Sequence, residues 1–120
     1  MPGERSEAFA RRLGFAGKDI IRGANSADVA LFRSERRTGA ELAERRRFLF
    51  TGRLIWHKAP TLLAAAYRDY RDRVSDPWDL EVVGDGPLRT DFEGLEGVKH
   101  HGFMQPEELA VLMRESSCLI

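Results

Sequence analysis

Three times in its second half, the chain passes from a short strand-like run into a glycine and then into a proline that opens a helical pattern. The three runs are 48–51, 80–83 and 98–101. Short runs that end at glycine are typical of strands in a parallel sheet, and helices between them are typical of its crossover connections. The repeat therefore predicts an α/β fold with a partial Rossmann-like parallel sheet and flanking helices.

The helices of this repeat are expected to begin at Pro60, Pro87 and Pro106, because a proline in the first helical turn costs no hydrogen bond. In the first helix an inward-facing row at i+4 spacing is expected, with two neighbours that widen it: Leu62, Ala66, Tyr70 and Val74, with Leu63 and Tyr67. The second helix is expected to bury Leu88, Phe92 and Leu95, and the third Leu109, Leu112 and Met113. Residues 118–120 predict a fourth strand.

Residues 1–46 carry a weaker pattern and are predicted to form a lead-in or linker segment with short helices, separate from a domain that spans 47–120. Within the lead-in, helices are expected at 6–13 and 38–47. A short strand is expected at 19–21 and a polar turn at 23–28.

Charge and composition argue against several classes of protein. Residues 1–60 carry 13 basic and 7 acidic side chains, and residues 61–120 carry 6 and 12. The basic cluster at 45–47 lacks interleaved aromatic residues, so nucleic-acid binding is not indicated. The sequence has no apolar run long enough for a membrane helix and no secretory signal, and its single cysteine, Cys118, permits no internal disulfide. A cytoplasmic location is therefore expected, with Cys118 as a buried small hydrophobic residue.

Two loops carry side chains suited to a ligand. Arg53 and Lys58 precede the start of a helix, where oriented N–H groups add to their charge, so a phosphate or diphosphate fits there. Two solvated side chains beside a turn are the alternative. The loop at 84–89 begins like a dinucleotide-binding fingerprint, but Arg89 stands at the third glycine position. Asp85 is suited either to a ribose or sugar hydroxyl or to capping the following helix.

The histidines do not predict a metal site. His100 and His101 are neighbours in a predicted strand and therefore point to opposite faces, so they cannot both line one pocket, and His57 is the only other histidine. The motifs of serine hydrolases, P-loop triphosphatases and zinc proteases are absent, and no cofactor is indicated. Trp56 and Phe103 flank the expected crevice, where they either stack on a base or sugar or pack at its edge.

Residues 48–120 carry, in order, the motifs FLFTGRLIWHK, APTLLAAAYRDY, LEVVGDGPLR and VKHHGFMQPEELAVLMRESSCLI. This series closely resembles the first part of the C-terminal domain of glycosyltransferases of the GT-B fold, family 4 (glycosyl transferases group 1). The segment KDIIRGANSADVALFR resembles the lead-in to that domain. On this resemblance, 47–120 is the N-terminal part of a nucleotide-sugar-binding Rossmann-like domain, truncated within the fold.

The resemblance implies a donor site made of loop residues. The donor diphosphate would be bound by Gly52, Arg53 and Lys58. The donor nucleotide would lie against Gly84, Asp85, Gly86, Phe103 and Met104. Ala59 departs from the glycine that the family frequently has after the lysine. No catalytic residue is implied within the chain, because the family's E-x7-E motif follows the fourth strand and is not present.

The chain is therefore expected to be a fragment of a retaining, metal-independent glycosyltransferase, which transfers a sugar from a nucleotide-sugar donor to an acceptor hydroxyl. Its partners would be the donor, an acceptor that is a sugar, a lipid or another hydroxyl compound, and the N-terminal Rossmann domain that the chain lacks. A peripheral membrane contact of the full enzyme stays open, as does enzymatic activity of the fragment itself. The alternative is a non-catalytic α/β module that binds a nucleotide or a protein.

Overall fold

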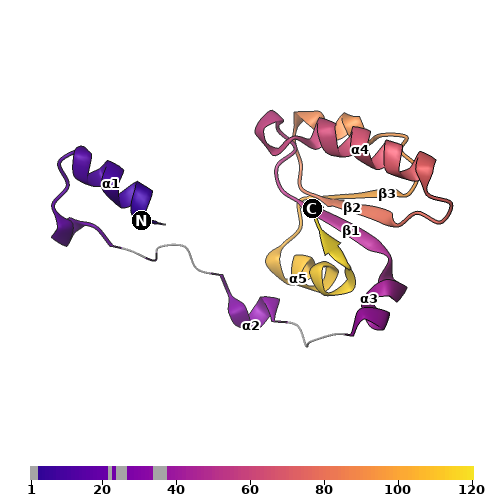
Figure 1. Cartoon of the computed structure of the whole chain (residues 1–120), viewed down its shortest axis with the longest axis horizontal. Coiled ribbons are helices and arrows are strands. Elements are labelled where there is room, and N and C mark those ends of the chain that lie inside the picture. Colours follow the sequence, from indigo (N-terminus) through magenta and orange to yellow (C-terminus); the bar gives the residue numbers. More distant parts are fainter. Residues whose placement is uncertain (1–2, 22, 24–26, 34–37) are drawn as a thin grey trace. The chain divides into compact units, whose positions relative to one another are not determined.

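The computed structural model describes residues 3–21, 23, 27–33 and 38–120, and the chain divides into two compact units, Met1–Phe32 and Arg33–Ile120 (Figure 1). The first unit contains α1 (Glu4–Arg12), a 3₁₀ turn at Gly17–Asp19 and α2 (Val29–Phe32).

The lead-in predictions have mixed outcomes. The helix expected at 6–13 is confirmed as α1, but the strand expected at 19–21 is wrong. That segment forms the end of the 3₁₀ turn and an extended stretch, because no strand of the described residues pairs with it. The polar turn expected at 23–28 lies partly outside the described residues.

The second unit is built on a four-stranded sheet in which all neighbouring strands are parallel, in the order β3-β2-β1-β4. The strands are β1 (Arg47–Thr51), β2 (Asp79–Val83), β3 (Val98–Gly102) and β4 (Cys118–Leu119). The helices are α3 (Gly39–Arg45), α4 (Pro60–Arg73) and α5 (Pro106–Glu115). The predicted α/β, Rossmann-like fold is confirmed. Among the described residues, no helix combines the length and apolar character needed to span a membrane.

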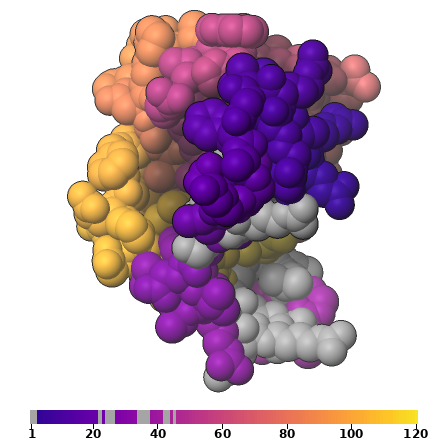
Figure 2. Space-filling view, turned by 90° about the vertical axis from the view of Figure 1, so that its left-hand side faces the viewer, coloured from indigo at the N-terminus to yellow at the C-terminus, as the bar shows by residue number. Residues whose placement is uncertain are grey.

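The sheet separates two hydrophobic cores, because alternate residues of each strand face opposite sides. On the side that α4 covers, the buried residues are Phe50, Leu54, Ala64, Tyr67, Leu80, Val82 and Phe92. On the side that α5 covers, they are Leu49, Val83 and Leu112, with Met104, Leu109 and Met113 packed against them. The predicted inner face of α5 is therefore confirmed, and its outer face reaches the surface of the unit (Figure 2, yellow).

The rotation of α4 about its axis differs from the prediction. Of the six residues expected to face inward, Leu62, Ala66 and Val74 are exposed, whereas Tyr67 is buried and Leu63 and Tyr70 pack against the core as predicted. Ala64, which was not expected to face inward, is also buried. The Tyr67 hydroxyl lies 3.0 Å from the carbonyl oxygen of Trp78, just before β2. The sequence offers two adjacent apolar rows on this helix. The hydrogen bond between Tyr67 and Trp78, which forms only in the folded chain, favours the row that contains Leu63 and Tyr67.

We expect the change Tyr67→Phe to lower the free energy of unfolding by about 1–2 kcal/mol near neutral pH. The Tyr67 hydroxyl lies within hydrogen-bond distance of the carbonyl oxygens of Trp78 and Gly97, and burial raises its pKa. The unfolded chain therefore loses this proton first as the pH rises through the ordinary value of 10.0, and the protonated folded state becomes less favoured.

Urea unfolding of both proteins at about pH 8 and about pH 11 tests this prediction. The stability difference between the original chain and Tyr67→Phe should narrow at the higher pH, because phenylalanine has no proton to lose. A difference that is absent at pH 8, or that stays constant across the range, would contradict it.

The segment after β2 is not the α-helix that Pro87 was expected to open. It is a 3₁₀ segment, Pro87–Phe92, kinked at Leu88, whose N–H donates to the Leu54 carbonyl oxygen at 3.1 Å. Gly94 and Gly97, with φ of 73°, then turn the chain toward β3. Phe92 is nevertheless buried and Leu95 packs against the same core, so these two predicted inner side chains are confirmed although the type of helix is wrong. Leu88, the third, is half-buried and is not part of that core.

Cys118 is exposed, which contradicts the prediction of a buried hydrophobic residue. It begins β4, which pairs with β1 through Phe48 and Leu49 and forms one edge of the sheet. An edge strand is covered by fewer neighbours than a central one, so an apolar run at that position does not imply burial.

Candidate functional site

Three loops meet at the carboxyl edge of the sheet, where parallel strands with crossover connections place them. They follow β1, β2 and β3, and a cavity of about 400 Å³ lies between them and the first turn of α5. We call this cavity the edge crevice. Its lining residues are Thr51, Gly52, Arg53, Val83, Gly84, Asp85, Phe103, Met104 and Leu109.

The first two loops are joined by backbone hydrogen bonds that continue the sheet beyond its strands. The N–H of Gly52 donates to the carbonyl oxygen of Val83, and the N–H of Leu54 donates to that of Asp85, both at 2.9 Å. The N–H of Gly84 donates to the end of β3 at 2.7 Å. The wall of the crevice is therefore fixed by the sheet before any ligand binds.

The position of Gly84 requires a glycine, because the loops after β1 and β2 are in direct contact there. A Cβ atom at Gly84, where φ is 126°, would lie 1.9 Å from the carbonyl oxygen of Gly52. At Gly86 it would lie 2.4 Å from the carbonyl oxygen of Leu54. Gly52 has room for a side chain, since its Cβ would meet only the Phe50 ring at 3.6 Å. The glycines after β1 and β2 therefore have different roles. Gly52 could carry a side chain, whereas Gly84 lies directly against the backbone of the neighbouring loop.

The direction of the Arg53 side chain follows from the packing of the next residue, Leu54. Leu54 is completely buried in the core beneath α4, so the preceding side chain faces the other way and lines the crevice. Arg53 is exposed, and among the described residues no carboxylate forms an ion pair with it. The crevice thus carries a guanidinium group whose donors are available to an anion.

Lys58 occupies a different position from Arg53. It is the last residue of the 3₁₀ turn Trp56–Lys58, directly before α4, and it is exposed. Of the eight residues that the sequence assigned to a donor site, the crevice brings together Gly52, Arg53, Gly84, Asp85, Phe103 and Met104. Lys58 and Gly86 are not among its lining residues.

We expect the change Ala59→Gly to raise the free energy of unfolding by about 0.5–1 kcal/mol. Ala59 joins the 3₁₀ turn to α4 in a left-handed conformation, with φ of 52°, which an L-residue with a side chain adopts at a cost. The control is Ala65→Gly, at an exposed position inside α4, which should lower stability by about 1 kcal/mol. Chemical denaturation of the three proteins checks the opposite signs, and a loss of stability at both positions would contradict the prediction.

Asp85 and Phe103 present two further kinds of contact to the crevice. Asp85 Oδ1 accepts a hydrogen bond from the N–H of Gly86 at 2.8 Å, so its carboxylate is oriented by its own loop and caps no later residue of the 3₁₀ segment. Phe103 is 75% exposed, although Met104 beside it packs on the core. An exposed aromatic ring at the rim of a cavity is suited to stacking on a planar group.

Sequence reasoning missed part of the lining. Thr51 and Val83 are the last residues of β1 and β2, and Leu109 lies in the first turn of α5. The alternation of residues along the strands places Thr51 and Val83 on the α5 side, so this signal could have found them. The bond from His100 Nε2 to the Gly84 carbonyl oxygen, at 2.9 Å, depends on how two strands align and left no signal in the sequence.

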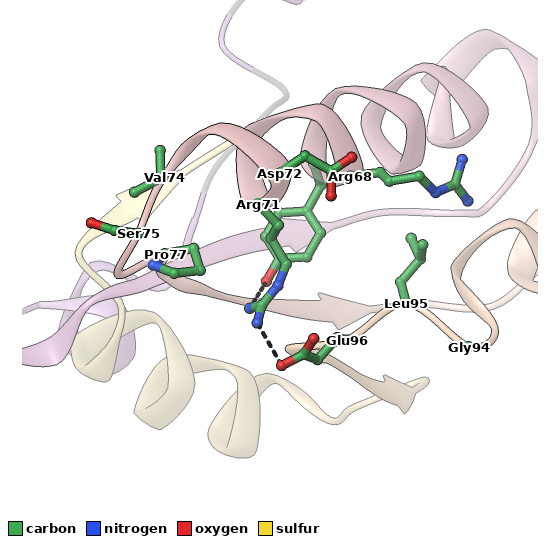
Figure 3. A pocket seen from close by; sticks show the side chains of 10 residues that line it. Arg68, Arg71, Asp72, Val74, Ser75, Pro77, Gly94, Leu95 and Glu96 are labelled. Atoms are coloured by element: carbon green, nitrogen blue, oxygen red, sulfur yellow. Dashed lines mark hydrogen bonds and ion pairs between the residues drawn. The ribbon is translucent and has the colours of Figure 1, made fainter.

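A second cavity of about 430 Å³ lies at the opposite, amino edge of the sheet, between the end of α4 and the turn before β3 (Figure 3). Its central cation is already engaged. Arg71 bonds the Tyr67 hydroxyl at 3.2 Å and Glu96 at 3.1 Å, and Asp79 lies 3.6 Å away. The hydrogen bond with Tyr67 is the main cause that raises the pKa of Arg71. The guanidinium group of Arg71 is therefore less available to an incoming anion than that of Arg53.

A third cavity, of about 660 Å³, lies between α5 and the β3 side of the sheet. Its buried carboxylate, Glu81, bonds His101 and lies 3.9 Å from Arg47, so its charge is compensated. His100 and His101 thus lie on opposite faces, as predicted. Among the described residues, no three histidine, cysteine or acidic side chains converge to bind a metal ion.

No protein-family model matches the chain, and no curated protein is significantly similar to it.

Proposed function

We propose that the chain is the donor-binding part of a glycosyltransferase and that the edge crevice binds the diphosphate of a nucleotide sugar. The observation that supports this most strongly is the position of Arg53 at the carboxyl edge of a parallel sheet, in one of two loops joined by backbone hydrogen bonds, with no ion-pair partner among the described residues. Ligands of open α/β sheets bind at this edge. A guanidinium can bind two phosphate oxygens at once, which suits a diphosphate better than a single charge does.

The remaining groups around the crevice fit the other parts of a nucleotide. Phe103 and Met104 provide an aromatic ring and a thioether for the base, and the free oxygen of the Asp85 carboxylate suits a ribose hydroxyl. Lys58 and the first turn of α4 lie directly after the Arg53 loop and add positive potential. In this proposal their role is long-range attraction, because Lys58 does not line the crevice.

In the complete enzyme these cations would stabilise the leaving diphosphate, on which negative charge develops as the sugar departs. The acceptor would be a hydroxyl of a sugar, a lipid or another compound, bound with the help of a second Rossmann domain. Retention of configuration and independence from metal belong to the proposal through the resemblance of residues 48–120 to family 4 glycosyltransferases of the GT-B fold.

A non-catalytic nucleotide-binding module is the second candidate. One observation favours it: among the residues that line the crevice, Asp85 is the single carboxylate, and one of its oxygens already accepts a bond from Gly86. A crevice with this lining provides groups that can bind a nucleotide, but it does not provide a pair of acid and base groups for catalysis.

Isothermal titration with UDP, GDP and ADP, each compared with its nucleoside, tests the proposed site. At least one nucleoside diphosphate should bind saturably and at least about tenfold more tightly than its nucleoside, with an affinity that falls as salt is added. Equal binding of nucleoside and diphosphate, or no binding of any of the six compounds, would contradict the proposal. Transfer from the matching nucleotide sugar by the chain combined with a GT-B N-terminal domain would then separate a transferase part from a binding module.

A further inference from the structure

The strand β3 is irregular where it passes the crevice. Val82 pairs with His100, but the next residue of β2, Val83, pairs with Gly102, so His101 is an extra residue in β3. Such a bulge redirects the side chains around it. Here the two histidines have separate partners, since His101 bonds Glu81 on the α5 side and His100 bonds the Gly84 carbonyl oxygen.

The bond between His100 and Gly84 has a defined direction. A carbonyl oxygen only accepts, so His100 Nε2, at 2.9 Å, carries a proton and donates it. Gly84 is thus bonded to β3 twice, since its own N–H donates to the carbonyl oxygen of Gly102 at 2.7 Å. Gly84 has no side chain and takes a φ of 126°, so hydrogen bonds rather than side-chain packing orient its peptide groups, and the His100 bond is the one made to its carbonyl oxygen.

The peptide group between Gly84 and Asp85 is trans, and its C=O and N–H therefore point in opposite directions. Because the carbonyl oxygen points to His100, the N–H of Asp85 points away from β3, toward the side on which β1 lies. Among the described residues this N–H has no hydrogen-bond partner. Both Asp85 and Arg53, which follows β1, line the edge crevice.

We infer that His100 is a positioning residue: by donating to the Gly84 carbonyl oxygen, it keeps the Asp85 N–H turned toward the crevice as a second donor for the anion that Arg53 binds. His100 itself pairs with Val82 on the α4 side of the sheet, bonds the loop after β2, and does not line the crevice. This inference rests on the proposed function of the edge crevice, but the orientation of the Asp85 amide can be measured without any ligand.

Three variants distinguish the effect of the hydrogen bond that His100 donates from the effect of the size of its side chain. His100→Gln keeps an N–H donor at a similar reach, His100→Leu removes the donor while retaining an apolar side chain of intermediate size, and Lys99→Leu is a control on the adjacent, exposed position of β3. UDP, GDP and ADP are titrated, and amide hydrogen exchange and the ¹⁵N shift of Asp85 are followed by NMR.

The expected result is that His100→Leu weakens diphosphate binding about five- to tenfold and shifts the Asp85 amide, while His100→Gln and Lys99→Leu stay within about twofold of the original chain. The inference would be overturned if His100→Gln bound the diphosphate as weakly as His100→Leu, or if His100→Leu bound it as tightly as the original chain. If the original chain binds no diphosphate, the proposed function fails, and with it the role of the Asp85 N–H toward an anion. The Asp85 amide then decides whether His100 positions this peptide group: it does if His100→Leu shifts the amide and His100→Gln does not, and otherwise the positioning role also falls.

Discussion

Replacement of Gly84 by alanine is expected to lower the free energy of unfolding by about 2–5 kcal/mol. This is the largest loss of stability that we expect from a glycine-to-alanine change in the second unit. Two costs add at this position. An alanine with φ of 126° is strained, and its Cβ would lie 1.9 Å from the Gly52 carbonyl oxygen, which is backbone and cannot rotate away. The loops after β1 and β2 would have to separate, and their shared hydrogen bonds would be lost.

Two control variants isolate the close approach from the strain. Gly94→Ala introduces a side chain at φ of 73° with no atom within 4 Å, so it should cost about 1 kcal/mol. Gly52→Ala meets only ordinary contact with the Phe50 ring and should change stability by less than about 1 kcal/mol. Urea unfolding monitored by circular dichroism gives the three values, and a Gly84→Ala loss no larger than that of Gly94→Ala would show that the loops are not in contact.

The change Arg53→Ala is expected to weaken binding of a nucleoside diphosphate about ten- to a hundredfold, because a charge-assisted hydrogen bond contributes about 1.5–3 kcal/mol. Stability should be nearly unaffected, since the side chain is exposed and has no partner among the described residues. Lys58→Ala should weaken binding less than Arg53→Ala does, because Lys58 lies outside the crevice lining.

Arg68→Ala serves as the charge-matched control for Arg53→Ala. Arg68 is an exposed arginine of α4 that lines the cavity at the amino edge of the sheet, so its loss changes the net charge equally without touching the crevice. Calorimetric titration should give an unchanged affinity for this variant. An Arg53→Ala protein that binds as tightly as Arg68→Ala would contradict the assigned role of Arg53.

Much of the fold could be predicted because it follows from local pattern. The strands ending near Gly52, Gly84 and Gly102 and the helices starting at Pro60 and Pro106 are all present. The rotation of α4, the 3₁₀ form of Pro87–Phe92 and the exposure of Cys118 could not be predicted. Each depends on a neighbour in space: the Trp78 carbonyl that Tyr67 bonds, the Leu54 carbonyl that Leu88 bonds, and the edge position of β4.

The same distinction applies to the edge crevice. Gly52, Arg53, Gly84, Asp85, Phe103 and Met104 could be assigned to one place, because parallel strands bring their following loops to the same edge. Lys58 lies at the end of the 3₁₀ turn Trp56–Lys58, five residues after Arg53, and this turn, which was not predicted, leaves it outside the crevice lining. The contacts of Gly84 with Gly52 and His100 depend on strand alignment and on the bulge in β3, and only the structure gives these.

The most direct test of the central claim is to map amide chemical shifts during titration with the nucleoside diphosphate that binds. Saturable changes should concentrate at the loops of the edge crevice, at Gly52, Arg53, Gly84, Asp85, Phe103 and Met104, with one common dissociation constant. The amino-edge cavity around Tyr67, Arg71 and Ser75 should remain unchanged and serves as the internal reference. Saturable changes confined to that cavity, or none at Arg53 and Asp85, would contradict diphosphate binding at the carboxyl edge.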